Sequence, residues 1–198
     1  LTDSSFLYAE LAASEVFRTG CLDLKDAPYG LAERLEKERL RIERGPLPIA
    51  SATRILGTLA IHQRKPTLDE ISRFSDTEPA EVLRFFAEHE HLFLMQPHTQ
   101  HRPSAQVLGF KHAEIYRHLV KTLLQNEGLR RAHDRLVAAY VMHCPIHDWY
   151  TLPDDGYFFQ HLGYHLFGAG RTEALINILT SSARWIDTQQ LATGSQLC

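Results

Sequence analysis

In the middle of the sequence, a strand pattern changes directly into a helical pattern. Two short apolar stretches, residues 92–95 and 106–110, flank the polar residues 98–104, which is typical of a strand–turn–strand unit. From residue 113 to residue 124, apolar side chains recur at three- and four-residue spacing, which predicts an amphipathic helix. The chain must therefore place a small hairpin beside the start of a helix, with His112 at the junction.

The remainder of the sequence predicts helices separated by short turns. Gly20 is placed to cap the end of the first helix, and Thr67 with Glu70 forms a capping box at the start of another. A loop is expected at 145–155, where Pro, Asp and Trp residues gather. The predicted helices span residues 4–18, 31–43, 49–63, 68–74, 79–91, 129–143, 156–169 and 172–179, and a last stretch contains Trp185 and Ile186.

This order of elements predicts a mainly α fold built around a winged-helix domain. Three helices followed by a two-stranded wing is the winged-helix order, and residues 46–112 have it. We therefore divide the chain into residues 1–45, 46–112 and 113–198, with α-helical segments on both sides of the winged helix. A chain of 198 residues, 44% of them hydrophobic, can bury the core of one or two compact domains.

The composition argues against several classes of partner. The formal net charge of −3 gives no electrostatic reason to expect nucleic acid or an anionic membrane. No apolar run approaches the ~18–20 residues that cross a bilayer, and no signal peptide pattern is present. The scattered cysteines, Cys21, Cys144 and Cys198, fit a reducing compartment. We expect a cytoplasmic protein, and because the sequence begins at Leu1 within a helical pattern, we treat it as a segment of a larger one.

DNA binding is the usual alternative for a winged helix, and the charges of the third helix oppose it. A recognition helix must present basic or amide side chains to phosphates and base edges. Here Arg84 is the lone basic residue, and it is outnumbered by acidic residues on the helix and its flanks. The expected wing is only mildly basic. The acidic residues are Asp76, Glu78, Glu81, Glu88 and Glu90.

The 12 histidines raise the question of a metal site. His161 and His165 stand four residues apart on one predicted helix, which is ligand spacing for zinc, and Cys144 and His147 precede them. Apolar residues flank the pair on the same helix, however, so a packed, hydrogen-bonded pair in the core is the favoured interpretation. The aromatic residues nearby are interpreted as core or as a packing surface: Phe158, Phe159, Tyr164 and Phe167.

The sequence lacks the motifs of a nucleotide-hydrolysing or nucleophilic enzyme. No GxxxxGK[ST] loop is present to wrap phosphates, and without it no acidic residue can be assigned to Mg²⁺. No Gly-x-Ser-x-Gly turn exists, and Cys144 has no evident activating partner. We therefore predict no catalytic residue. His112, in contrast, is expected beside the free N–H groups of a helix's first turn, where a bound phosphate would be held.

Residues 109–119, Gly-Phe-Lys-His-Ala-Glu-Ile-Tyr-Arg-His-Leu, resemble the end of the winged-helix domain in signal-transduction NTPases of the NB-ARC/NACHT (STAND) class. In that class a Met-His-Asp element contains a histidine that senses the phosphates of bound ADP. The matching residues here are Lys111, His112 and Ala113, so only the histidine carries over. The resemblance implies that His112 contacts the phosphates of ADP, and Lys111 is a second candidate contact.

Other short stretches resemble the same class, in the order in which that class has them. Residues 5–11 match an element of the helical domain that follows the nucleotide-binding domain, and residues 66–71 match the start of a NACHT winged-helix segment. Residues 155–175 resemble the helical domain of apoptotic protease-activating-factor-like proteins. The resemblance implies that residues 1–45 end one helical domain and that residues 113–198 begin a superhelical one, which often leads into WD repeats.

By this resemblance, the chain is a non-catalytic regulatory segment of a signalling protein switched by ATP and ADP. It would hold its own nucleotide-binding domain in an autoinhibited state and relay the nucleotide state to downstream repeats, with homo-oligomers forming on activation. ADP or ATP with Mg²⁺ would bind the larger protein, and no cofactor is expected in the segment itself. Two alternatives stay open: a helical scaffold without nucleotide sensing, suggested by Ala113, and a winged-helix DNA-binding regulator.

Overall fold

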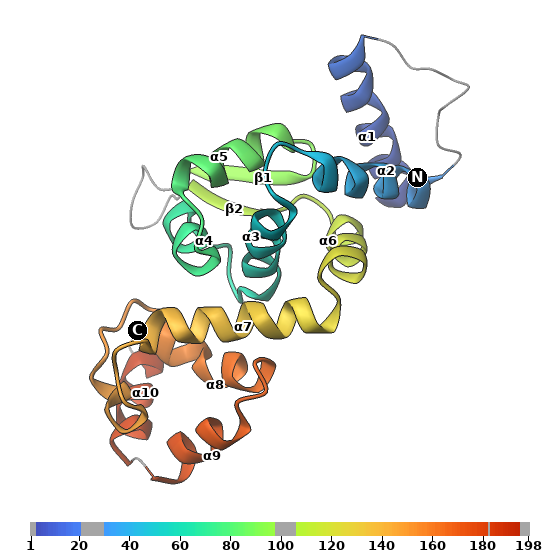
Figure 1. The fold of residues 1–198 in the computed structure, drawn as a ribbon. Helices are drawn as coiled ribbons and strands as arrows, with labels where there is room; N and C mark the ends of the chain where they lie inside the picture. The colour runs from blue at the N-terminus through green and yellow to red at the C-terminus, as the bar shows by residue number, and fades with distance from the viewer. Residues whose placement is uncertain (1–2, 21–29, 98–105, 182, 195–198) are drawn as a thin grey trace.

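The structure, a computed structural model, describes residues 3–20, 30–97, 106–181 and 183–194. Over these residues the chain is mainly helical and contains one two-stranded antiparallel sheet (Figure 1). This arrangement confirms the predicted mainly α fold class with a short β-hairpin. No helix in these ranges is long and apolar enough to cross a membrane.

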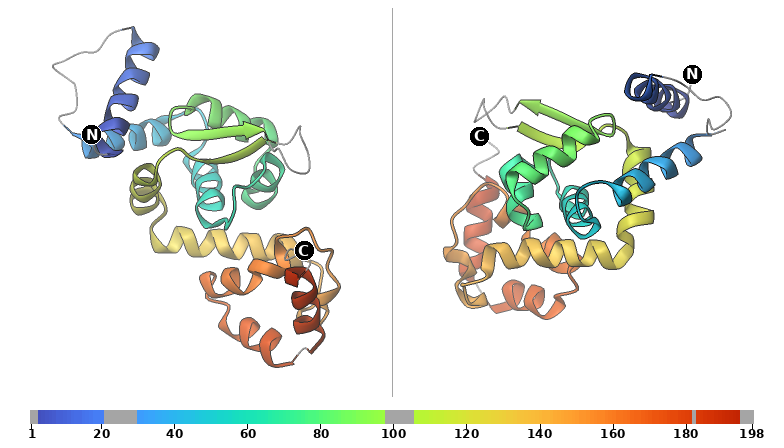
Figure 2. Two further views of the ribbon diagram at one scale, coloured as in Figure 1. Left: turned by 180° about the vertical axis from the view of Figure 1, so that it is seen from behind. Right: turned by 45° about the horizontal axis from the view of Figure 1, so that its top comes forward.

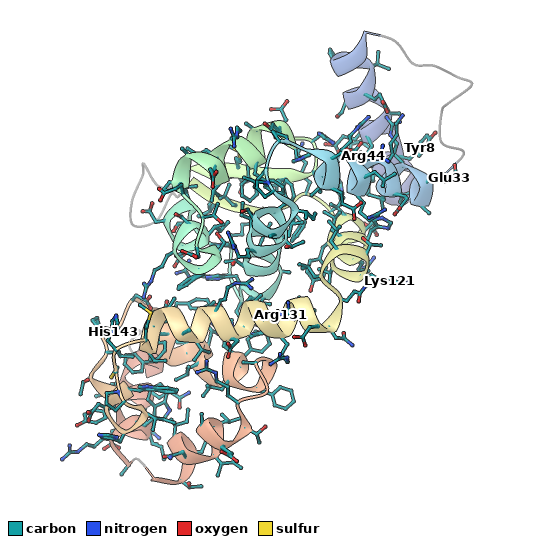
Figure 3. The ribbon with its side chains drawn as sticks, viewed as in Figure 1. Tyr8, Glu33, Arg44, Lys121, Arg131 and His143 are labelled. Atoms are coloured by element: carbon teal, nitrogen blue, oxygen red, sulfur yellow. The ribbon has the colours of Figure 1, made fainter. Side chains whose placement is uncertain are left out.

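The chain begins with a pair of packed helices, α1 (Asp3–Thr19) and α2 (Leu31–Arg44). The first helix ends at Gly20 as predicted: the residue has a φ of +71°, and its N–H donates to the carbonyl of Val16 at 2.8 Å. Tyr8 on α1 and Glu33 on α2 lie where the two helices meet (Figure 3). Only part of the apolar pattern of α1 is buried, because Phe6, Val16 and Phe17 are exposed.

Three helices and a hairpin follow in the predicted order. They are α3 (Ile49–Ile61), α4 (Leu68–Ser75), α5 (Pro79–Glu88), β1 (Phe93–Pro97) and β2 (Gln106–Phe110), with Phe93 opposite Phe110 in the sheet. The predicted capping box is present, because the Thr67 N–H donates to the Glu70 carboxylate at 2.8 Å and the Glu70 N–H donates to the Thr67 hydroxyl at 3.3 Å. The predicted turn at 98–104 lies outside the described residues.

Helix α5 ends at Glu88, three residues before the predicted end at His91. His89 leaves the helical conformation with φ −121° and ψ 31°, and its carbonyl accepts the Leu92 N–H at 2.8 Å. This turn takes the chain into β1, which begins one residue later than predicted. The apolar pattern did not indicate the difference because His89 is itself buried, like the helix residues before it.

The predicted gap between residue 124 and residue 129 does not exist. Helix α6 (Ala113–Leu119) passes into a π-helical turn, η1 (Val120–Leu124), and α7 (Gln125–Val141) begins with the next residue. Gln125 has a φ of +54°, so the chain changes direction within one residue and needs no loop. No Gly or Pro stands at this break to announce it in the sequence.

The C-terminal part contains α8 (Phe158–Gly168), α9 (Thr172–Ser181) and α10 (Ala183–Gly194). The stretch 145–155, predicted as a loop, contains a 3₁₀-helix, η2 (Ile146–Thr151). The reason is local: Trp149 is buried in the core, and its indole N–H donates to the Cys144 carbonyl at 3.0 Å, which pulls the segment into a tight helical turn.

Two hydrophobic cores lie on opposite sides of the long helix α7 (Figures 1 and 2). The first core is formed by α1–α6, the hairpin and η1, and the second by the end of α7 with η2 and α8–α10. The first core contains Leu35 and Ile115, so it extends across both predicted domain boundaries, which themselves stay predictions. A smaller bridging cluster joins the two sides: Ile61, Phe74, Ala132, Leu136 and Tyr157.

Candidate functional site

His112 occupies the position that the sequence predicted for it, between the hairpin and the following helix. It is the N-cap residue of α6, with extended backbone angles of φ −134° and ψ 147°. The preceding residue is tied to the hairpin, because the Lys111 N–H donates to the Leu92 carbonyl at 3.1 Å. The pair Lys111–His112 is therefore held at a fixed place by backbone structure on both sides.

The side chains of both residues contact one carboxylate. The Nε2 atom of His112 lies 3.0 Å from Oε2 of Glu10, and the Nζ atom of Lys111 lies 3.3 Å from Oε1 of the same residue. All three side chains are partly exposed. Burial raises the pKa of Glu10, but the hydrogen bonds from His112 and Lys111 outweigh this effect and hold the pKa below its usual value of 4.5. Glu10 is thus a carboxylate at neutral pH.

Sequence reasoning did not find Glu10. It lies on α1, 102 positions before His112, and nothing in the local pattern distinguishes it from other acidic residues on a helix surface. Only the packing of α1 and α2 onto the first core brings it to the start of α6. The structure thus places both predicted site residues together and adds a third residue, Glu10, whose carboxylate contacts both of them.

A hollow of about 460 Å³ opens beside this contact, between the end of α3, strand β2 and the start of α6. Arg64, Lys65, Lys111 and His112 are among its lining residues, and none of the described residues that line it is acidic. The basic side chains of the hollow differ in whether an acidic side chain pairs with them. Arg64 forms an ion pair with Glu70 at 3.0 Å, whereas Nζ of Lys65 contacts the neutral amide oxygen of Gln96 at 3.2 Å.

The chemistry available here is the binding of an oxyanion. Lys111 and His112 already hold a carboxylate, and the basic hollow continues the same positive surface. Apolar rings, Phe110 and Tyr116, also line the hollow. Within the described ranges, no three His, Cys, Asp or Glu residues are grouped so that they could hold a metal ion.

Of the two histidines of α8, His165 is packed in the protein interior, which confirms the favoured interpretation for this residue, whereas His161 is only half-buried. The hydroxyl of Tyr157 accepts the Gln63 N–H at 3.1 Å and lies 2.8 Å from Nε2 of His165. The Nδ1 atom of His165 in turn lies 2.9 Å from Nδ1 of His133. The tyrosine can donate to His165, which can then donate from Nδ1 to His133, so two neutral rings satisfy this chain. The ring of His161 contacts that of Tyr157 in a tilted arrangement, with the ring centroids 4.6 Å apart.

Burial fixes the neutral state of these rings. It lowers the pKa of His133 to about 4 and that of His165 to about 3, with neighbouring histidines adding to the effect at His165. His62, whose ring lies tilted against that of Tyr157 with the centroids 4.0 Å apart, also has its pKa lowered to about 4 by burial. The aromatic residues divide: Phe158 and Phe159 are core, whereas Tyr164 and Phe167 are exposed.

The acidic surface predicted for the third helix is present. The exposed residues of α5 and its flanks include four of the acidic residues against one arginine, Arg84. A surface of this charge repels a nucleic-acid backbone. The four exposed acidic residues are Asp76, Glu78, Glu88 and Glu90.

Comparison with known proteins finds a family match in the C-terminal part. Residues 129–197 match the family model of the APAF-1 helical domain. The match begins within α7, so it covers the second core and the His133–His165 pair and does not extend to His112. No curated protein and no solved structure matches the chain significantly. The match agrees with the resemblance of residues 155–175 and supports an APAF-1-like context for the chain.

Proposed function

We propose that this chain is the regulatory segment of a STAND-type signalling protein that is switched by ATP and ADP. In this proposal residues 1–45 end a helical domain, residues 46–112 form a winged helix, and residues 113–198 begin the superhelical domain. The segment holds the nucleotide-binding domain closed while ADP is bound and swings away on exchange for ATP. His112 is the residue that contacts the nucleotide phosphates.

The observation that supports this role is that His112 and Lys111 both contact one carboxylate at the edge of a basic hollow. Two adjacent donors that hold two oxygens of one carboxylate can hold two oxygens of a phosphate in the same way. The APAF-1 helical domain matched from residue 129 supports the same context, because it follows this site in the chain after α6 and η1.

The donor set fits the phosphates of a nucleotide and does not include ligands for Mg²⁺. When bound to the larger protein, ADP supplies the negative charge to which His112 and Lys111 respond. The two residues orient toward that charge and transmit its presence through α6, which continues into η1 and α7. Proposed partners are the protein's own nucleotide-binding domain, its downstream repeats and, on activation, other copies of itself.

The test is the substitution His112→Ala in the longer protein that contains the nucleotide-binding domain. Loss of one hydrogen bond to a charged group weakens ADP binding by roughly 1.5–3 kcal/mol and favours the open, active state. Retention of labelled ADP and basal signalling activity are the measurements. His147→Ala is the matched control, because His147 is exposed and lies in η2, whose Trp149 belongs to the second core. ADP retention and basal activity equal to those of the unmodified protein would contradict the sensor role.

A helical scaffold without nucleotide sensing is the second candidate. The Glu10 carboxylate contacts Nε2 of His112, and Ala113 stands where the Met-His-Asp element has an acidic residue. Both features favour a scaffold in which the histidine only makes a structural contact. The His112→Ala experiment separates the two candidates, since a scaffold predicts lower stability of the chain with no change in ADP retention.

DNA binding is proposed to be absent, on the basis of the acidic surface around α5. A mobility-shift assay with duplex DNA at increasing salt is the appropriate test. Tight binding at physiological salt with a steep salt dependence would overturn this part of the proposal.

A further inference from the structure

We propose that Glu10 is a built-in competitor for the oxyanion site at Lys111 and His112, so that anion binding there and the docking of α1 exclude each other. This inference rests on the proposed function, because it describes how the same site is regulated. The occupant of the site is either the Glu10 carboxylate or a diphosphate group, and the position of α1 reports which one is bound.

The geometry of the contact supports the competition. One carboxylate oxygen of Glu10 faces Nε2 of His112 at 3.0 Å, and the other faces Nζ of Lys111 at 3.3 Å. Nε2 of His112 can make one hydrogen bond, so a phosphate oxygen can reach it, and one phosphate group can bridge His112 and Lys111, only after the carboxylate has left. A phosphate group offers the same pair of oxygens with a larger charge, so it is a chemically suitable replacement.

The balance of charge points the same way. While Glu10 is in place, its carboxylate offsets part of the positive charge of Lys111. Once it leaves, Lys111, His112 and Lys65 line one hollow without an acidic residue among its described lining. The site thus gains affinity for anions at the moment at which α1 undocks.

The position of Glu10 on its helix links the site to the rest of the molecule. Glu10 lies between Leu7 and Leu11, which are the buried contacts of α1 with the first core. Losing the carboxylate contact therefore weakens the hold on the same stretch of helix that anchors α1. Because the coupling is reciprocal, an anion that releases α1 binds more tightly when α1 is already released.

The experiment uses the 198-residue chain and inorganic pyrophosphate as the probe. Isothermal titration calorimetry compares the unmodified chain with Glu10→Gln and with Glu114→Gln. The control removes the same charge from a neighbouring residue, because the Glu114 carboxylate contacts Arg117 and neither Lys111 nor His112. We expect Glu10→Gln to tighten pyrophosphate binding by about five- to tenfold and Glu114→Gln to change it by less than about twofold.

The double variant Glu10→Gln/His112→Ala tests whether pyrophosphate binds at this site. It should lose most of the affinity gained in Glu10→Gln, because one of the two donors is gone. Pyrophosphate binding that is equal in the unmodified chain and in Glu10→Gln overturns the competition. A gain that persists in full in the double variant overturns it as well, because the anion is then bound elsewhere.

A second measurement needs no variant. Pyrophosphate should speed the hydrogen exchange of α1 amides in the unmodified chain, compared with sodium chloride at equal ionic strength. Exchange in α1 that is the same in the two salts contradicts the release of the helix. These outcomes are independent of the sensor role, which fails only if His112→Ala leaves ADP retention in the longer protein unchanged.

Discussion

The helix pair α1–α2 and the C-terminal body of α8–α10 are attached to the middle of the molecule by different chemistry. Across the first junction, glutamates of α1 and α2 meet histidines: Glu10 contacts His112 at 3.0 Å, and Glu38 contacts His91 at 2.8 Å. Across the second junction, the bridging cluster and the chain from Tyr157 through His165 are neutral and buried. Apolar residues of α1 and α2 are also buried in the first core. The two junctions therefore differ in the polar contacts that accompany the apolar ones.

This difference indicates which junction is able to open. The Glu10–His112 contact is partly exposed, and contacts of this kind contribute at most about 1 kcal/mol each and weaken with salt or with a competing ion. The Glu38 carboxylate, in contrast, is buried. Burial of each large apolar side chain is worth about 1.5–3 kcal/mol and does not respond to a competing anion. We infer that α1–α2 is the part that moves, with a hinge near Gly45–Pro48, while the middle and the C-terminal body behave as one unit.

The largest expected effect comes from the second core. Leu162 is 1% exposed on α8, so Leu162→Ala should cost about 2–5 kcal/mol and lower the melting temperature of residues 113–186 in one cooperative transition. Differential scanning calorimetry is the measurement. Leu191→Ala is the matched control, since Leu191 is 75% exposed and its loss should be nearly neutral. Two separate melting steps would mean that the C-terminal body is not rigidly joined to the middle.

A smaller effect is expected from two glycines of one helix. A Cβ atom on Gly168 would lie 2.5 Å from the His133 ring, so Gly168→Ala must displace a buried, hydrogen-bonded histidine at a cost of about 1–3 kcal/mol. At Gly163 the nearest atom, Cδ1 of Leu175, is 3.8 Å away, so Gly163→Ala should stabilise the helix by about 0.5–1 kcal/mol. Urea unfolding of both variants tests the pair, and equal effects would show that the His133 contact is loose.

The two junctions should lose stability in different pH ranges when acid is added. Burial lowers the folded-state pKa of His133 to about 4 and of His165 to about 3, so between pH 6.5 and 4 the unfolded chain binds protons that the folded chain does not. The free energy of unfolding of the second junction therefore decreases as the pH is lowered through that window. At pH 5 the loss is about 2 kcal/mol for each histidine. The pKa of Glu10, raised by burial but lowered further by its hydrogen bonds, stays below 4.5, so its contribution is full above pH 4.5 and is lost below it.

Tryptophan fluorescence measures the acid effect selectively. The two tryptophans of the chain, Trp149 and Trp185, are both buried in the second core. Urea unfolding followed by their fluorescence should shift to lower urea between pH 7 and pH 5. A midpoint that is constant over this range would contradict the neutral, buried histidine pair.

Much of the fold could be predicted because its signals are local. Helical periodicity predicted the helices to within a few residues, and the spacing of Thr67 and Glu70 predicted a capping box that the structure contains. The break at Gln125 could not be predicted, since neither Gly nor Pro marks its positive φ. The turn at η2 could not be predicted either, because it follows from the burial of Trp149 by residues that come later in the chain.

The candidate site could be predicted only in part, for the same physical reason. The histidine at the start of a helix is a local feature, so His112 and Lys111 were found. Its partner is not local: Glu10 reaches it through the packing of two helices that precede the hairpin. The pairing of His133 with His165 likewise depends on how α7 crosses α8, although the apolar neighbours of His165 predicted its burial.

The most direct test of this account is native-state hydrogen exchange of the unmodified chain at pH 7, resolved by segment. We predict that α1 and α2 open together with a lower free energy than the rest, and that α3, α7 and α8 exchange in one common, higher-energy opening. Exchange of α8 through an opening of its own, or protection of α1 and α2 equal to that of α7, would contradict the assignment of the moving junction.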